Sequence, residues 1–457
     1  MKIGKYACVL TAALLCGVGL GMGPLTESQV ERQVRPLIDA EIAPGVSVTV
    51  YKNGGVQSFG FGSDTFGGEG KAPDEHTIYE VGSITKVFTG LLLAEAVRRG
   101  EAGLDDPLSE HLPEGVRAPE RDGKELTLVQ LATHSSSLPR MPSNIAPTDP
   151  LDPFNGYTPK SLWRFIGSWR PERAPGSEYE YSNLGMGLLG QLLADEAGMD
   201  YATLVQTRIC EPLGLEDTRI EPTEAQRSRV ATGHLEGKPT PPWHFDALAG
   251  CGALHSTTSD LMKFLRANMD PPKGALAESI NASHEPHFTM PDGQKVALAW
   301  HIARDGSTYW HNGQTYGCSG YMCYNKAFDS AVVVLANGSC EEIAQVGVNI
   351  LFQLGGADPD PIKMDVPAKV APEQLERLVG VYQSQVGFAI TITRDERRLY
   401  AAVTGQGPLR VYPESPTLFK YRAVKAELEF QLDDEAEHAK TLTLFQNGME
   451  FVCTRKE

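Results

Sequence analysis

The sequence lacks the long apolar run that a membrane-spanning helix needs, which is about 20 residues. Its N-terminal apolar run extends only from about residue 6 to residue 20, behind Lys2 and Lys5. A short apolar run that follows basic residues is typical of a signal peptide. We therefore predict that residues 1–23 are a signal peptide and that the chain is exported, periplasmic or secreted. The alternative is an uncleaved N-terminal segment that associates the chain with a membrane.

An excess of positive charge is also absent. Asp and Glu number 58 against 41 Lys and Arg, which gives a formal net charge of −17. Nucleic acid and anionic lipid surfaces repel such a chain, so neither is expected as its main partner. The hydrophobic share of 41% and the charged share of 22% indicate a folded protein rather than a disordered one. Its 457 residues suffice for two or three domains, and the oligomeric state is left open.

No cysteine spacing in the sequence matches a metal-binding pattern. Two cysteines lie in the predicted signal peptide, and six follow it: Cys210, Cys251, Cys318, Cys323, Cys340 and Cys453. An even number in an exported chain permits disulfide bonds, although spacing alone does not give their pairing. Small buried thiols are the alternative, and the sequence leaves both open.

Strand patterns occur near both ends of the first 355 residues, and helix patterns lie between them. Valines alternate with polar residues from 46 to 50, and Asn53-Gly54 then favours a hairpin turn into a second strand. Residues 83–99 carry a helical apolar stripe followed by a glycine stop signal. Short β-rich segments return between residues 297 and 336. This order predicts one sheet built from distant segments, with an inserted helical lobe, over residues 24–355.

The C-terminal part of the chain shows a different pattern. Residues 356–370 contain three prolines and little periodicity, which is typical of a linker. Residues 371–457 carry about six short strand patterns and a strong hairpin signal at Asn447-Gly448. Closely spaced short strands predict a second domain, a small antiparallel β-barrel or sandwich.

The most informative local feature is a serine at the start of the helix predicted over residues 83–99. Ser83 follows Gly82 and precedes Lys86 by three residues, so the two side chains share one helix face. A serine hydroxyl becomes a nucleophile when a neighbouring base takes its proton, and a buried neutral lysine amine can serve as that base. The helix N-terminus adds free N–H groups that favour an oxyanion. Taken alone, Ser83 also fits a plain helix cap.

Two further segments present polar groups where a substrate could bind. Tyr181-Ser182-Asn183 opens a helix pattern, and a tyrosine beside a lysine can share the serine proton and return it to a leaving group. His311-Asn312-Gly313 ends a strand pattern, and a glycine there permits close approach of a backbone. Each segment alone also fits a structural role, as a helix cap in the first case and as a packed histidine in the second.

The order Ser-x-x-Lys, Tyr-x-Asn and His-x-Gly resembles the motif set of serine β-lactamases and penicillin-binding proteins, most closely the class C branch with its carboxypeptidase and esterase relatives. The segment from Tyr79 to Lys86 is similar to the class C active-site segment, with Thr85 in place of serine or alanine. The resemblance extends over about residues 30–354. It implies an α/β fold, an antiparallel sheet flanked by helices. Residues 371–457 resemble the lipocalin-like barrels appended to several of these relatives.

The resemblance implies a catalytic role for three residues. Ser83 would be the acylated nucleophile, Lys86 its proton acceptor and Tyr181 the second acid/base group. No metal and no organic cofactor is implied. The implied mechanism is acylation of the serine followed by hydrolysis of the acyl-enzyme.

On the substrate side, the resemblance assigns the substrate amide to Asn183 and places His311 and Gly313 where class C β-lactamases carry a Lys-Thr-Gly triplet. Gln314 follows that glycine, and its backbone N–H would form the oxyanion hole together with that of Ser83. A lysine in the triplet is a permanent cation for a substrate carboxylate, whereas a histidine is mostly neutral at pH 7. Carboxylate recognition is therefore expected to be weaker or pH-dependent.

These residues predict a serine hydrolase that cleaves β-lactam or D-alanyl amide bonds, in small molecules or peptidoglycan peptides. An esterase acting on small acyl esters with the same residues is the alternative, and a penicillin-binding sensor with little turnover is a third. Among the remaining polar residues, His134 is expected to make a structural hydrogen bond. Trp243 and His244 are expected in a loop, where they either line the cleft or only pack.

Overall fold

The computed structural model describes residues 24–66, 70–395, 397–433 and 435–456, so the predicted signal peptide lies outside the described residues. The chain divides into two compact units. The first unit contains residues 42–363 and the chain up to Ile38, and the second contains residues 364–457 with Asp39–Glu41. The boundary after Lys363 lies inside the segment that we predict as a linker, residues 356–370.

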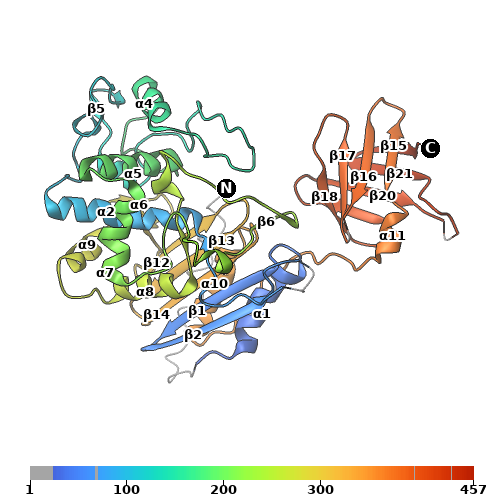
Figure 1. The fold of residues 1–457 in the computed structure, drawn as a ribbon, viewed down its shortest axis with the longest axis horizontal. Helices are drawn as coiled ribbons and strands as arrows, with labels where there is room; N and C mark the ends of the chain where they lie inside the picture. Colours follow the sequence, from blue (N-terminus) through green and yellow to red (C-terminus); the bar gives the residue numbers. More distant parts are fainter. Residues whose placement is uncertain (1–23, 67–69, 396, 434, 457) are drawn as a thin grey trace. The chain divides into compact units, whose positions relative to one another are not determined.

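The first unit is built on an eight-stranded sheet (Figure 1), in the order β2-β1-β14-β13-β12-β11-β10-β9. Strand β1 (Gly45–Lys52) pairs antiparallel with β2 (Gly55–Gly62), as the predicted hairpin, and with β14 (Ser330–Ala336) on its other side. Val46 stands opposite Ala336 in this register. The two ends of the unit therefore meet in one sheet, which confirms the predicted assembly from distant segments.

Helical segments cover both faces of this sheet. Strand β13 (Ser319–Asn325) shows this, because successive side chains of a strand point to opposite faces. Tyr321 points to helix α10 (Ile343–Leu354), where a Cβ added to Gly347 would overlap the Tyr321 ring. The neighbouring Gly320 faces the other way, and a Cβ added there would lie 3.3 Å from Ile84 Cδ1. Helix α10 thus covers one face, and the chain around Ile84 covers the other.

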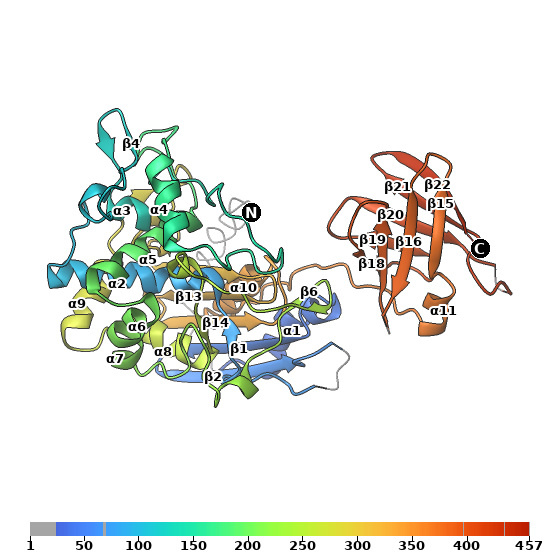
Figure 2. The same cartoon turned by 45° about the horizontal axis from the view of Figure 1, so that its top comes forward.

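The layer on the second face consists mainly of helices α2 (Thr85–Arg99), α5 (Asn183–Ala197) and α8 (Thr258–Met269), which lie together in both views (Figures 1 and 2). Helix α2 is buried along its first twelve residues, so it forms the centre of the unit. Phe88 of α2 stacks on Phe264 of α8, with ring centroids 4.2 Å apart. Gly100 ends α2 in a left-handed conformation, φ 71°, as the sequence predicts.

The first unit also contains further helices, turns and strands. The helices are α1 (Glu27–Asp39), α3 (Leu128–Ala132), α4 (Pro159–Ser168), α6 (Tyr201–Val205), α7 (Glu211–Leu213) and α9 (Ala275–Ser283), with 3-10 turns η2 (Gly82–Ile84) and η6 (Ala249–Cys251). The strands are β3 (Tyr79–Glu80), β4 (Glu120–Arg121), β5 (Lys124–Glu125), β6 (His234–Leu235), β7 (Lys238–Pro239), β8 (His255–Ser256), β9 (Phe288–Thr289), β10 (Lys295–Val296), β11 (His301–Ile302) and β12 (Thr308–Gln314).

The second unit is a closed barrel of antiparallel strands in sequence order, which follows helix α11 (Pro372–Glu376). Its strands are β15 (Gly380–Ser384), β16 (Ala389–Arg394), β17 (Leu399–Val403), β18 (Leu409–Pro413), β19 (Leu418–Tyr421), β20 (Ala426–Gln431), β21 (Thr441–Gln446) and β22 (Met449–Arg455). Tyr382, Phe419 and Phe430 belong to its buried core. The predicted barrel is confirmed, whereas the predicted number of about six strands was too low.

The six cysteines of the described chain are all free and buried. Burial raises the pKa of the Cys323 and Cys340 thiols to about 12. Of the two alternatives that the sequence leaves open, buried thiols are the one found. Among the described residues, no helix is long and apolar enough to span a membrane.

Candidate active site

Ser83 and Lys86 lie at the start of helix α2. The short turn η2 leads into α2, and the three-residue spacing places both side chains on one side of the helix start. The Lys86 Nζ atom donates to Ser83 Oγ at 2.9 Å and to the backbone oxygen of Cys251 at 2.6 Å. Lys86 is fully buried, whereas Ser83 is partly exposed. The amine therefore lies within direct proton-transfer distance of a hydroxyl that a ligand can reach.

Two glycines allow the chain around η2 to touch the end of strand β12. Gly82 has φ +49°, and a Cβ on it would lie 2.7 Å from the backbone nitrogen of Gln314. A Cβ on Gly313 would overlap the Val81 carbonyl and lie 3.1 Å from the Ile84 nitrogen. Side chains at these positions would force the two backbones apart, so both glycines are needed for this close approach.

The close approach places the backbone N–H group of Gln314 beside that of Ser83. Thr315 donates to the Cys318 oxygen across the β12–β13 hairpin at 2.9 Å, and hydrogen bonding alternates along an antiparallel pair. The N–H of Gln314, one residue earlier, therefore points away from β13 and towards η2. The N–H of Ser83 lies in the first turn of a helix, where it has no partner within the helix. Two such donors beside a nucleophile are suited to stabilising an oxyanion.

The Tyr181–Asn183 turn lies against the same site from the helical side. The Tyr181 ring centroid is 5.0 Å from Lys86 Nζ, and no hydrogen bond of the Tyr181 hydroxyl to another described residue is present. His134 holds this turn, since its Nδ1 accepts the N–H of Ser182 at 3.1 Å and its ring lies 4.4 Å from that of Tyr181. The structural hydrogen bond that the sequence predicts for His134 is confirmed, and its partner places His134 directly beside Tyr181.

His311 lies next to the site but does not line the cleft. Its side chain is fully buried, and its Nδ1 lies 2.6 Å from the backbone oxygen of Asn312. Burial, with His301 and Lys86 nearby, holds the pKa of His311 well below its ordinary value. His311 is therefore neutral over the usual pH range and offers no charged surface to a ligand.

A cleft of about 410 Å³ opens beside Ser83. Of the residues that the sequence predicts for the site, four line it: Ser83, Asn183, Gly313 and Gln314. Lys86 and His311 lie beneath its surface. The structure thus brings the predicted residues from α2, α5 and β12 to one place.

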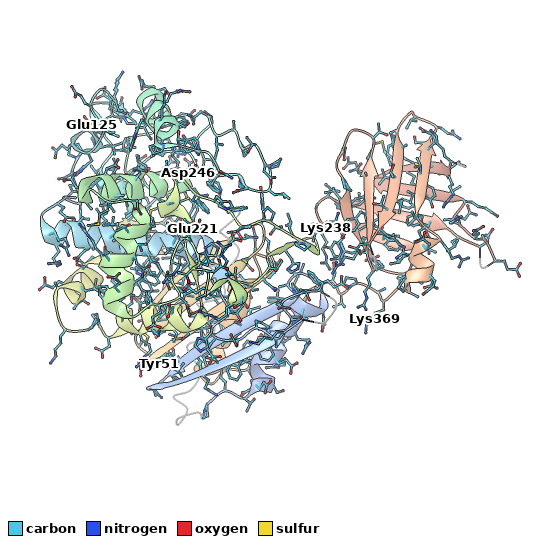
Figure 3. The ribbon with its side chains drawn as sticks, in the orientation of Figure 1. Tyr51, Glu125, Glu221, Lys238, Asp246 and Lys369 are labelled. Carbon is cyan, nitrogen blue, oxygen red and sulfur yellow. The ribbon has the colours of Figure 1, made fainter. Side chains whose placement is uncertain are left out.

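One wall of the cleft is aromatic. It is formed by Phe154, Trp243, Phe245 and Tyr316. Phe154 stacks on Phe245 with ring centroids 4.4 Å apart, and Trp243 meets Tyr316 edge-on at 4.8 Å. The labelled Asp246 marks the loop that carries Trp243 (Figure 3). Of these residues, the sequence analysis considered only Trp243 for the cleft, because no local motif links three segments so far apart in the chain.

Below this wall lies a carboxyl group that the sequence analysis did not single out. Glu80 is 8% exposed and accepts the N–H of Trp243 at 2.7 Å and the hydroxyl of Thr315 at 3.0 Å. It therefore connects the aromatic loop to the hairpin that carries Gln314. Burial raises the pKa of the Glu80 carboxyl to about 7.

A raised carboxyl pKa gives a pH dependence of stability with a definite sign. Between the unfolded pKa of 4.5 and about 7, the folded chain holds a proton on Glu80 that the unfolded chain has lost, so stability falls as pH rises. As the pH rises from 5 to 8, the unfolding free energy of the wild type should fall by about 3 kcal/mol more than that of Glu80→Gln. Urea unfolding followed by tryptophan fluorescence measures this unit alone, because all five tryptophans precede Lys363. An equal pH dependence of the two proteins would contradict the buried-carboxyl account.

Comparison with known proteins finds similarity to one family over most of the chain. The family model described as Beta-lactamase matches residues 30–346. The D-alanyl-D-alanine-carboxypeptidase/endopeptidase AmpH of Escherichia coli (strain K12) is 32% identical over 266 residues, which cover 57% of this chain and 68% of AmpH. A beta-lactamase of Yersinia enterocolitica is 32% identical over 294 residues, which cover 62% of this chain and 72% of that protein.

A solved structure is similar over nearly the whole chain. The octameric penicillin-binding protein homologue from Pyrococcus abyssi superposes with a TM-score of 0.64 at 22% identity, and the match covers 94% of this chain and 100% of that one. At this identity the likeness shows the fold, which agrees with the sheet, the helical layers and the barrel described above.

Proposed function

The chain belongs to the beta-lactamase family, and from this premise we propose that it is an exported serine hydrolase that forms an acyl-enzyme on Ser83. The observation that carries the proposal is the 2.9 Å contact between Lys86 Nζ and Ser83 Oγ, beside two free backbone N–H groups. A nucleophile, a base and an oxyanion site are the three parts that acyl transfer requires. The export part rests on the sequence of residues 1–23.

The proposed reaction has two steps. The Ser83 oxygen forms a bond to the substrate carbonyl carbon while its proton passes to the amine of Lys86, and the N–H groups of Ser83 and Gln314 hold the oxyanion. The bond to the leaving group then breaks, and the leaving nitrogen or oxygen receives a proton through Tyr181. In the second step a water oxygen bonds to the ester carbonyl carbon, the bond from that carbon to Ser83 Oγ breaks, and one water proton passes to the serine oxygen, which restores its hydroxyl.

The proposed substrates are amides of the β-lactam or D-alanyl peptide type. The support is the similarity to a beta-lactamase and to a D-alanyl-D-alanine-carboxypeptidase/endopeptidase at 32% identity each. Asn183, which lines the cleft, has the side-chain amide to bind a substrate amide. Small molecules and peptidoglycan peptides both fit this class.

An esterase that acts on small acyl esters is the second candidate. The observation that favours it is the buried, neutral state of His311. By the resemblance, His311 stands at the position where class C β-lactamases carry a lysine. Because His311 is neutral, it does not strengthen the binding of an amide substrate that carries a carboxylate. Esters need a less powerful acid for the leaving group than amides do, since an alkoxide or phenoxide leaves more easily than an amine anion.

Steady-state turnover of three substrates distinguishes these candidates: a chromogenic cephalosporin, a peptide ending in D-alanyl-D-alanine, and p-nitrophenyl butyrate. The proposal expects turnover of the first or second by the wild type and loss of that turnover in Ser83→Ala. Turnover of the butyrate alone would replace the amide proposal with the esterase, while burst acylation without turnover would indicate a sensor. Full activity of Ser83→Ala on all substrates would overturn the site assignment.

A further inference from the structure

Two side chains of opposite charge, Arg140 and Glu341, belong to the described lining of the cleft beside Ser83. Arg140 is the cation of the pair, and its side chain is exposed. Among the described residues, none forms an ion pair with its guanidinium within 4 Å. The positive charge of Arg140 is therefore available to a ligand in the same cleft as the nucleophile.

The position of Arg140 is fixed by its neighbours in the site. Its backbone oxygen accepts the N–H groups of Asn183 and Leu184 at 3.0 and 3.2 Å. Its guanidinium carbon lies 5.2 Å from the centroid of the Tyr181 ring, a distance at which a cation is attracted to an aromatic face. Arg140 is thus tied both by its backbone and by its side chain to the turn that carries Tyr181.

The proposed reaction indicates which part of the substrate Arg140 would contact. The leaving group receives its proton through Tyr181, so it departs on the side of the cleft where Arg140 lies. The aromatic wall of Phe154, Trp243, Phe245 and Tyr316 lines the same cleft and is available to the acyl group. A negative charge on the leaving group would come within reach of the Arg140 guanidinium, and a guanidinium binds a carboxylate through two parallel hydrogen bonds.

We propose that Arg140 binds a carboxylate on the leaving group, so that the site prefers acyl donors whose scissile bond lies one residue from a free carboxylate. This inference rests on the proposed function and names its substrate class: C-terminal residues are removed, rather than internal or neutral bonds cleaved. Arg140 would supply the cation that the buried His311 does not. Glu341, with the opposite charge in the same cleft, disfavours a carboxylate near itself.

A matched pair of esters tests the proposal. Both carry a phenylacetylglycyl acyl group, whose ring suits the aromatic wall, and they differ only in the leaving group, 3-hydroxybenzoate or 3-hydroxybenzamide. In Arg140→Gln, kcat/KM should fall about 10- to 100-fold for the carboxylate ester, since a hydrogen bond to a charged group contributes that factor. The carboxamide ester should change by less than about threefold. Arg140→Lys, which keeps the charge, should recover part of the loss.

Two control variants separate the possible failures. Arg227→Gln removes the same charge from an exposed side chain outside the cleft lining and should leave the ratio of the two esters unchanged. An equal loss on both esters in Arg140→Gln would overturn the proposal, because Arg140 would then act only by holding Tyr181. An unchanged ratio would overturn it as well. Persistent turnover in Ser83→Ala would instead refute the proposed function, whatever Arg140 does.

Discussion

Exchanging Lys86 for methionine is expected to slow acylation about 1000-fold, the range in which a positioned general base acts. Lys86 Nζ contacts Ser83 Oγ at 2.9 Å, and Lys86 is fully buried, so no solvent base can take its place. Methionine has a similar length and leaves no unpaired charge in the interior. The fold should therefore persist, and the loss should appear in the rate constant of acylation measured by stopped flow.

Lys263→Met is the matched control for this variant. Lys263 is a partly exposed lysine on α8 that pairs with Asp260, and it lies outside the lining of the Ser83 cleft. Its replacement should leave acylation within about twofold of the wild type, since changes at exposed sites have small effects. Circular dichroism and tryptophan fluorescence of both variants report whether they fold. A folded Lys86→Met protein with wild-type acylation would show that another group takes the Ser83 proton.

Replacing Gly313 with alanine is expected to lower kcat by about 100-fold or more. The added Cβ would overlap the Val81 carbonyl, so strand β12 and the turn η2 must separate. Separation moves the N–H of Gln314 away from that of Ser83, and the loss of one oxyanion donor costs a factor of that size. The unfolding free energy should also fall, by about 1–3 kcal/mol, as in other overpacked sites.

A glycine in open space provides the comparison for Gly313→Ala. Gly407, in the loop before β18, has no atom within 4 Å of an added Cβ. Gly407→Ala should therefore keep both activity and stability. In Gly313→Ala, a loss of kcat with little change in KM would identify the displaced oxyanion donor as the cause. Such a donor acts mainly in the transition state. A rise of KM at unchanged kcat would mean that the contact between β12 and η2 serves substrate binding alone.

The sequence predicts those features of the molecule that depend on residues close together in the chain. Ser83 and Lys86 are three residues apart where the turn η2 leads into helix α2, and the hairpin of β1 and β2 follows from Asn53-Gly54. The barrel was predicted with too few strands because β15, β18 and β19 are only four or five residues long. Such strands carry only one to three buried residues, which is too few for a clear alternation.

The chemical environment of the site depends on contacts that no short pattern contains. Glu80 lies beneath Trp243, 163 residues away in the chain, and Arg140 stands over Tyr181. The burial of His311 likewise depends on what packs against β12, so the sequence left its charge open. These features arise from the meeting of distant segments, so no local pattern in the sequence contains them.

Whether Ser83 carries the acyl group can be determined by intact-mass spectrometry. The protein is mixed with a slowly hydrolysed β-lactam or with the carboxylate ester, quenched in acid within seconds, weighed and digested. We expect a mass increase of one acyl group on the peptide that contains Ser83, and no increase in Ser83→Ala. An adduct on another residue, or the same adduct in Ser83→Ala, would contradict it.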